Sequence, residues 1–267
     1  KLFEAAVARI TAQHTRPRDG EALYYLAVTS EFLGDYAGAE EAFYRASWSA
    51  AWYSQSFHAL ARLACRKGDF NTALERLERA RSANTQDARI LCLEAAALRH
   101  LGRSGAAAEL AAQALALDCL DHVAACELAL DKGATGDPLD GKAASIANPL
   151  QTRLEVACHY INAGMNAEAV QVLSPLAPAS GAANPLVYYY LADLNRNLGL
   201  DNRAAACLEL AAKQSADLVF PFRLETIGVL RRAIAASPKD GRAPYYLGNL
   251  LFEGQPEAAI ARSEERR

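Results

Sequence analysis

The sequence predicts an all-α protein made of stacked helical hairpins, and repeated residue columns carry this prediction. Glycines recur 34 residues apart at Gly34, Gly68 and Gly102. Alanines recur at the same interval in three columns: Ala27, Ala61 and Ala95; Ala39, Ala73 and Ala107; Ala46, Ala80 and Ala114. Leucine fills a fifth column at Leu26, Leu60 and Leu128, which Glu94 interrupts. A hairpin of this length cannot bury its own apolar face, so each hairpin is expected to cover its neighbour in a right-handed α-solenoid with a concave surface.

The chain is expected to begin within a repeat. Ala5 and Ala12 fall 34 residues before Ala39 and Ala46, so residues 1–13 resemble the second helix of an earlier hairpin. The sequence is therefore expected to be a piece of a longer protein.

The first complete hairpin is predicted to pair residues 21–33 with residues 36–47. The turn between them falls at Gly34 and Asp35, because glycine adopts the positive φ that ends a helix. Apolar residues at i, i+3 and i+4 within these ranges predict a buried helix face.

The fourth unit begins on schedule and then loses its second helix. Leu128, Ala129 and Gly136 each lie 34 residues beyond their predecessors, but residues 133–141 are rich in Gly, Pro and Asp. Such residues favour turns over helices. The predicted organisation is a first block at 1–133 (a partial repeat, three full repeats and the start of a fourth), an irregular linker at 134–149, and a second, degenerate block at 150–267.

In the second block Gly164 and Gly199 lie 35 residues apart and predict two more turns. Residues 215–223 break the pattern, a helix is predicted at 223–236, and a last hairpin is predicted to turn at Gly254. The chain then holds about six hairpin units.

These columns resemble the tetratricopeptide-repeat (TPR) superfamily over essentially the whole chain. A narrower resemblance rests on residues 42–48, on 154–157 with Gly164, and on 220–225 with 245–251. These segments are similar to the C-terminal repeat region of large bacterial proteins whose N-terminal half is a β-rich domain of unknown function similar to galactose mutarotases. The resemblance implies an upstream domain with a carbohydrate connection, and it places no catalytic residue on this chain.

Composition argues against several classes of partner. The net charge of -3 and the pI near 6.0 give no electrostatic footprint for nucleic acid or an anionic membrane. No apolar run reaches the roughly 20 residues that span a bilayer. Six cysteines occur without a CxxC pair, which is typical of a reduced protein. A cytoplasmic protein is therefore expected.

The TPR resemblance implies a binding groove on the first helix of each hairpin. Its exposed positions are expected 10, 6, 3 and 2 residues before the turn glycine. The partner-binding candidates chosen from these positions are Tyr24, Phe32, His58, Arg62, Arg66, Arg99 and His100 in the first block, and Tyr189, Asp193, Arg196, Asn197, Tyr245 and Asn249 in the second. Arg62, Arg66 and Arg99 are predicted to form one basic wall that suits an acidic ligand.

Each part of this surface has a plain alternative. The arginines and histidines could form an ordinary solvated helix face, and the second-block aromatics could pack inside the protein or serve a peptide or a sugar. Trp52 and Tyr53 offer a further stacking platform.

A metal site and an enzyme active site are both disfavoured. Cys119, His122 and Cys126 could place three ligands along one helix face, but this spacing equally describes core positions, so no metal or other cofactor is expected. The chain has no Gly-rich phosphate loop, GxSxG or HExxH motif. The predicted function is a non-catalytic protein-interaction scaffold, and the alternative is an accessory region of a carbohydrate-active or carbohydrate-binding protein.

Overall fold

The computed structural model describes residues 1–12, 16–133, 136–141, 148–177, 183–252 and 254–264, with side chains up to Ile260. Every regular element within these ranges is helical, which confirms the all-α prediction for them. The chain divides into two compact units, of residues 1–145 with 162–165 and residues 146–161 with 166–267. No described helix has the length and apolar character needed to cross a membrane.

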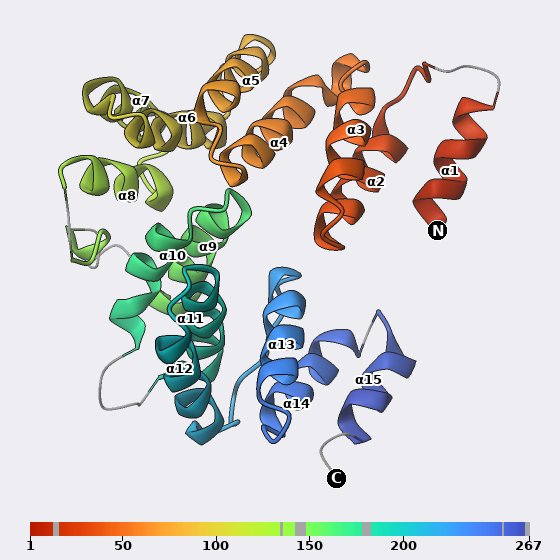
Figure 1. Cartoon of the computed structure of the whole chain (residues 1–267). Helices are drawn as coiled ribbons and strands as arrows, with labels where there is room; N and C mark the ends of the chain where they lie inside the picture. The colour runs from red at the N-terminus through yellow and green to blue at the C-terminus, as the bar shows by residue number, and fades with distance from the viewer. Residues whose placement is uncertain (13–15, 134–135, 142–147, 178–182, 253, 265–267) are drawn as a thin grey trace. The chain divides into compact units, whose positions relative to one another are not determined.

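Unit 1 consists of helices that pair with their neighbours along the chain (Figure 1). Its elements are α1 (Leu2–Thr11), α2 (Glu21–Phe32), α3 (Tyr36–Ala46), the 3-10 helix η1 (Ala50–Trp52), α4 (Tyr53–Arg66), α5 (Phe70–Ala83), α6 (Ala88–His100), α7 (Ser104–Leu117) and α8 (His122–Asp131). The hairpins are α2 with α3, α4 with α5 and α6 with α7, and α8 packs on α7.

The hairpins of unit 1 turn through left-handed glycines. Gly34, Gly68 and Gly102 have φ angles of 83°, 77° and 72°. A side chain would strain the backbone in this region, so the glycine column is a requirement of the turn. The following residue then starts the next helix: the Asp35 carboxylate accepts a hydrogen bond from the Gly38 amide at 2.9 Å and caps α3.

The alanine columns lie where the helices cross. Ala27, Ala61 and Ala95 are fully buried at 0% exposure, as predicted. The other two columns are equally buried, with exposures of at most 2%: Ala39, Ala73 and Ala107; Ala46, Ala80 and Ala114. Alanine has no side chain beyond Cβ, so helices that cross at these positions approach closely and gain dispersion contacts.

The fourth unit corrects the predicted register. The chain turns at Gly133, with φ 78°, rather than at Gly136. Gly133 follows Gly102 by 31 residues instead of 34, because α8 is short and ends at Asp131. Cys126 rather than Ala129 therefore takes the fully buried small-residue position.

Helix α1 forms where a helix was predicted, but the two alanines on which the prediction rested are not buried. Ala5 and Ala12 are exposed, whereas Val7 is buried in a cluster with Leu23 and Ala46. Helix α1 packs chiefly on α2, the first helix of the next hairpin.

Unit 2 is also helical, and tyrosines are the largest side chains of its core. Its elements are α9 (Pro149–Asn162), α10 (Asn166–Leu173), the 3-10 helix η3 (Ser174–Leu176), α11 (Pro185–Asn197), α12 (Asp201–Lys213), α13 (Glu225–Ala236), α14 (Arg242–Leu251) and α15 (Pro256–Glu264). The largest side chains exposed at 1% or less are Tyr160, Tyr188, Tyr189, Tyr190 and Tyr246. Gly199 makes the predicted left-handed turn between α11 and α12, with φ 73°.

Helix α11 is the centre of unit 2. It packs against α10, α12 and α13, and α14 packs between α13 and α15. The Tyr190 hydroxyl and the Thr226 hydroxyl are 2.8 Å apart in a buried hydrogen bond that joins α11 to α13. Residues 214–224 connect α12 to α13 without a helical turn (Figure 1).

We expect Ala61→Leu to destabilise unit 1 by about 1–3 kcal/mol, because the added carbons overpack a fully buried position between helices. Urea unfolding followed by circular dichroism measures this. Ala106→Leu, at an exposed position of α7, is the control and should change stability by less than about 0.5 kcal/mol. Equal stabilities of the two variants would contradict the close approach inferred for this position.

Candidate partner-binding surface

The seven candidates of unit 1 fall into two sets. The exposed set is Phe32, Arg66 and His100, each two residues before its turn glycine. The half-buried set is Tyr24, His58, Arg62 and Arg99. The two sets contact different neighbouring residues.

The exposed set lies beside the turns of the hairpins. The Arg66 guanidinium lies 4.7 Å from the centre of the Tyr36 ring. His100 stacks on Phe70, with 4.4 Å between ring centres and 7° between their planes. Tyr36 and Phe70 are the first residues of α3 and α5, so each contact joins one hairpin to the preceding one. The prediction missed both aromatic partners.

Two arginines of the half-buried set are paired with carboxylates of adjacent repeats. Arg62 on α4 donates to Glu31 on α2. Arg99 on α6 donates to Glu127 on α8, with distances of 2.9 Å from Nε and 3.3 Å from Nη2. The predicted basic wall is therefore wrong in this respect, because carboxylates of the same unit balance both charges.

Glu127 escaped the sequence analysis because of the shift in register. Counted from Gly133, it stands six residues before the turn, as Arg62 does before Gly68. Its side chain is only 1% exposed. The salt bridge therefore lies in a protected environment, where the two charges interact more strongly than they would in water.

Tyr24 belongs to an aromatic cluster at the N-terminal end of unit 1. Its ring centre lies 4.7 Å from that of Trp52 and 5.4 Å from that of Phe43. The Trp52 indole donates from Nε1 to Asp19 at 3.1 Å. Trp52 is thus half-buried, and Tyr25 at 40% exposure carries the open edge of the cluster.

Electrostatic effects connect three consecutive hairpins on one face. Burial raises the pKa of the Tyr24 hydroxyl, and nearby Arg62 and Arg89 act in the opposite direction. Burial also acts to raise the pKa of the Asp87 carboxyl, but the hydrogen bond from Arg89 and the proximity of His58 bring that pKa below its usual value. We call these five residues, from α2, α4 and the start of α6, the first-helix face. Arg89 and Asp87 were missed because the prediction considered only positions closer to the turn.

Two candidates of unit 2 are internal. Tyr189 is 1% exposed, and its hydroxyl donates to the Asp240 carboxylate at 2.5 Å. Asp193 is 7% exposed and accepts two hydrogen bonds from Arg232, at 2.5 Å and 2.8 Å. The space enclosed beside them is about 10 Å³, which holds no more than one water molecule. The expectation that both lie on an open groove is corrected: α13 covers this part of α11.

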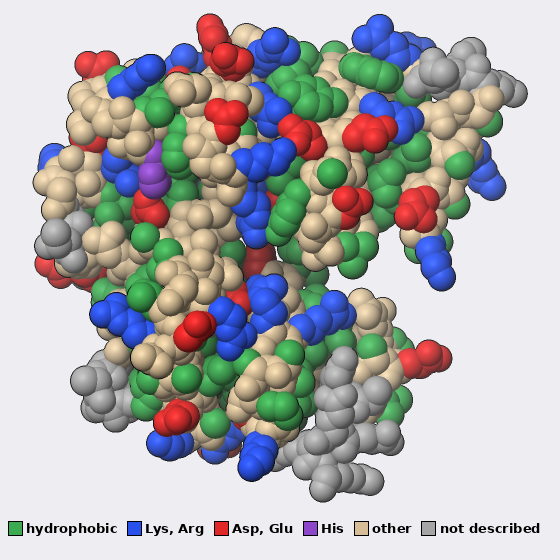
Figure 2. Space-filling model, in the orientation of Figure 1, with side chains coloured by type: hydrophobic (Ala, Val, Ile, Leu, Met, Phe, Trp, Pro, Cys, Tyr) green, Lys and Arg blue, Asp and Glu red, His purple; other side chains and the backbone are tan. Residues whose placement is uncertain are grey.

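The other unit 2 candidates have more access to solvent. Arg196, Asn197 and Asn249 are exposed, and Tyr245 is half-buried against Tyr246 with 5.7 Å between ring centres. Glu253, at an equivalent position, lies outside the described residues. On the face drawn in Figure 2, basic and acidic side chains are interspersed.

The cysteines do not form the arrangement considered for a metal. Cys119 is exposed in the turn before α8, whereas Cys126 is fully buried within α8. The expectation that they lie on one helix face is therefore wrong. Within the described ranges, no three His, Cys, Asp or Glu side chains are grouped as metal ligands. Burial raises the pKa of the Cys65 and Cys158 thiols to about 12, which keeps both protonated near neutral pH.

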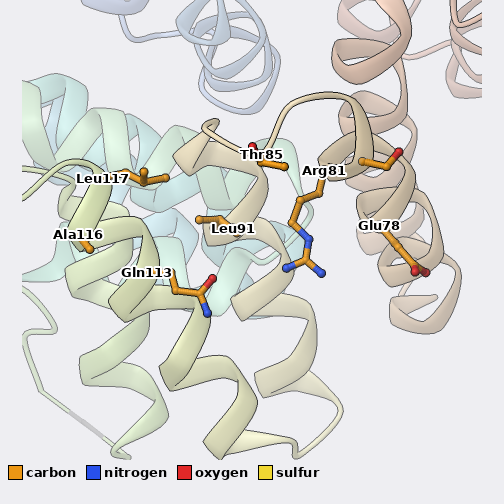
Figure 3. Close-up of a pocket in the computed structure, with 8 residues that line it drawn as sticks. Glu78, Arg81, Thr85, Leu91, Gln113, Ala116 and Leu117 are labelled. Carbon is orange, nitrogen blue, oxygen red and sulfur yellow. The ribbon is translucent and has the colours of Figure 1, made fainter.

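A hollow of about 590 Å³ lies between α5, α6 and α7. Arg81 and Gln113 extend into it, and Leu91 and Leu117 line another side (Figure 3). Arg81 also pairs with Glu94, with 3.4 Å between Nη2 and Oε1.

Glu94 is the residue that interrupts the leucine column. It is 9% exposed, and its Oε2 atom has no hydrogen-bond partner among the described residues. Burial raises the pKa of its carboxyl, Arg81 acts to lower it, and Glu78 adds to the increase. The buried charge is therefore incompletely compensated.

No family model matches the chain. A tetratricopeptide repeat protein from Parabacteroides merdae ATCC 43184 is similar at 18% identity and a TM-score of 0.41, over 92% of this chain and 98% of that chain. The MamA protein is similar at 16% identity and a TM-score of 0.39, over 73% of this chain and 90% of that chain. MamA 41-end from Desulfovibrio magneticus RS-1 is similar at 14% identity and a TM-score of 0.29, over 79% and 90%.

Arg99→Ala should destabilise unit 1 by about 3–5 kcal/mol, because it leaves the buried Glu127 carboxylate without its cation. Chemical unfolding of the purified chain measures the loss. Replacing both partners, by Arg99→Leu with Glu127→Leu, should recover most of the stability, since no buried charge is then left unpaired. A double variant as unstable as Arg99→Ala would show that the pair is not the cause.

Glu94→Leu should stabilise the chain by about 1–3 kcal/mol at neutral pH, because it removes a buried oxygen without a partner and restores the leucine column. Arg81, whose side chain is 37% exposed, stays hydrated. Thermal unfolding measures the change, with Glu109→Leu on the exposed side of α7 as the control.

The effect of removing the Glu94 charge on stability should depend on pH, and Glu94→Gln, which removes the charge but keeps the shape of the side chain, tests this. A carboxyl whose pKa is raised by folding disfavours the folded state above that pKa, and the penalty disappears once the pH falls below the unfolded-state pKa of about 4.3. The advantage of Glu94→Gln over the wild type should therefore grow between about pH 4 and neutral pH. A constant difference would contradict the raised pKa.

Proposed function

We propose that unit 1 is a non-catalytic protein-interaction scaffold whose first-helix face binds a segment of a partner protein. The observation that carries the proposal is that Arg62 of the second hairpin and Arg89 of the third both lie near enough to Tyr24 of the first to act on its hydroxyl. Side chains from successive repeats that meet on one face make a continuous surface, which is how stacked hairpins hold an extended ligand.

The residue types suit a protein partner. Tyrosine, tryptophan and arginine are enriched among the residues that dominate binding energy in protein interfaces. The aromatic cluster of Tyr24, Tyr25 and Trp52 lies beside Arg62, which Glu31 already holds in place. Side chains fixed before binding lose less conformational entropy when a partner docks.

The charge pattern favours a partner segment with mixed side chains over a run of acidic residues. Arg62 is paired with Glu31, and Arg89 is paired with Asp87 at 2.7 Å. An acidic ligand would have to displace these carboxylates, whereas tyrosine, amide or apolar side chains would not. With a net charge of -3, nucleic acid and anionic membranes are not proposed as partners.

A carbohydrate role is the second candidate. The half-exposed edge of Tyr25, next to Trp52, is the observation that favours it, because aromatic rings stack on the apolar faces of sugars. A link through a β-rich upstream domain remains part of this alternative.

Peptides selected from a random display library against the whole chain test the main proposal. Arg89→Ala should weaken their binding about tenfold, or 1.4 kcal/mol, and Arg89→Glu should weaken it further. Arg203→Ala, exposed on α12, is the control and should bind as the wild type does. The Arg89 side chain is 71% exposed, so these changes should leave helicity and melting temperature nearly unaltered.

Two results would contradict the proposal. Selected peptides could bind all the variants equally, which would move the site elsewhere. A glycan array could instead give ligands that Trp52→Ala abolishes while the protein stays folded, which would favour the carbohydrate role.

A further inference from the structure

An exposed apolar segment in unit 2 has no role in the fold described above. Between α12 and α13, Leu218, Phe220, Phe222 and Leu224 are 87%, 70%, 62% and 58% exposed. The residues between them turn inward: Val219 is 5% exposed, Pro221 is buried and Arg223 is half-buried. From Val219 to Arg223 this alternation is the pattern of an extended backbone, in which successive side chains point to opposite faces, whereas Leu218 has a φ of 58° and Leu224 is already helical as the N-cap of α13. We call the four outward residues the apolar strip.

The backbone of this segment is open as well. The amides of Phe220, Phe222 and Arg223 make no hydrogen bond to other described residues, and Pro221 has no amide hydrogen. In an extended chain the N–H and C=O groups of residues i and i+2 point to the same side. The Phe220 and Phe222 groups therefore share one edge, and Pro221 belongs to the other.

The segment is held in place on unit 2. The Arg223 guanidinium lies 5.2 Å from the centre of the Phe222 ring, and its Nη2 is 3.4 Å from the Gln151 carbonyl oxygen on α9. The Arg223 carbonyl in turn accepts a hydrogen bond from the Thr226 amide at 3.2 Å, in the first turn of α13. The outward phenylalanines are thus presented by a fixed backbone.

The backbone of Leu218 has an unfavourable conformation. Its φ is 58°, which makes it the only non-glycine residue with positive φ in the described part of the chain. A leucine is disfavoured in this conformation, and such strain is often found at functional sites. Here it accompanies the most exposed side chain of the strip.

We propose that the apolar strip is a docking site for an extended segment of a partner protein, which pairs with the Phe220–Phe222 edge as an added β-strand and covers the strip with alternate apolar side chains. The open amides favour this occupant, because an extended partner chain offers carbonyl acceptors at the matching spacing. Lipid acyl chains offer no acceptors, and Asp217 and Glu225 flank the strip with negative charge that disfavours an anionic bilayer. The proposal concerns unit 2 and does not depend on the function proposed for unit 1.

The test uses 12-residue peptides selected from a random library against the whole chain. The variant combines Phe220→Ser with Phe222→Ser, and the control is Phe252→Ser, which removes a phenylalanine that is also 70% exposed. Circular dichroism and melting first establish that all three proteins fold alike. Peptides that bind the wild type should alternate apolar and polar residues, bind the double variant at least tenfold more weakly, and bind Phe252→Ser within twofold of the wild type.

N-methylation of alternate peptide nitrogens on the pairing edge should abolish binding, and methylation of the other edge should not.

Four outcomes would overturn the proposal. The selection could give no peptide that depends on Phe220 and Phe222, or binding could be indifferent to N-methylation on either edge. Wild-type protein, but not the double variant, could sediment with phosphatidylcholine–phosphatidylglycerol vesicles, which would assign the strip to a membrane. Analytical ultracentrifugation could show a wild-type dimer that the double variant does not form, which would assign it to a second copy of the chain.

Discussion

The close approach of helices at the alanine seams is the constraint on which unit 1 depends. Each helix packs against its neighbour at small, fully buried residues, and the left-handed glycines return the chain at a fixed distance from each of these positions. The repeat length follows from these two requirements, because a crossing point and a turn must recur together. Where the turn comes early, at Gly133, the crossing residue moves with it, from Ala129 to Cys126.

Unit 2 reaches a packed interior in a different way. Its central helix α11 buries three consecutive tyrosines, and burial of a phenol requires a partner for its hydroxyl. Tyr189 finds Asp240 and Tyr190 finds Thr226, so two of the three hydroxyls tie α11 to residues beyond residue 214. Alanine seams hold the hairpins of unit 1 by shape, whereas polar contacts between large side chains hold α11 and α13 together.

Much of this architecture could be predicted from the sequence, because glycine and alanine columns report local requirements of turns and crossings. The register of the fourth unit could not, since Gly133 and Gly136 are both acceptable turn residues and only the length of α8 decides between them. The candidate site was predicted less well. Counting back from a turn identifies the solvent side of an isolated hairpin, but it says nothing of α13, which covers Tyr189 and Asp193.

A signal for the Arg62–Glu31 salt bridge was present in the sequence, and one for Arg99–Glu127 emerges once the fourth turn is placed at Gly133. Glu31 stands three residues before its turn and Arg62 six residues before the next, and Arg99 and Glu127 occupy the same two positions with the charges exchanged. Positions of opposite charge in successive repeats predict a pair once the repeats are known to stack. The arginines were instead grouped by sign, which overlooked the carboxylates between them.

The exchanged charges of these two pairs mean that the repeats of unit 1 are not interchangeable. In the first pair the earlier hairpin supplies the acid, and in the second the earlier hairpin supplies the base. If the third hairpin followed directly on the first, Glu31 would meet Ala96 and lose its cation. If the second hairpin instead preceded α8, Glu127 would face Cys65 in place of Arg99. A gene that gained or lost a repeat at this place would therefore encode a buried charge without a counterion. The order of the hairpins is fixed by charge even though their shapes are alike.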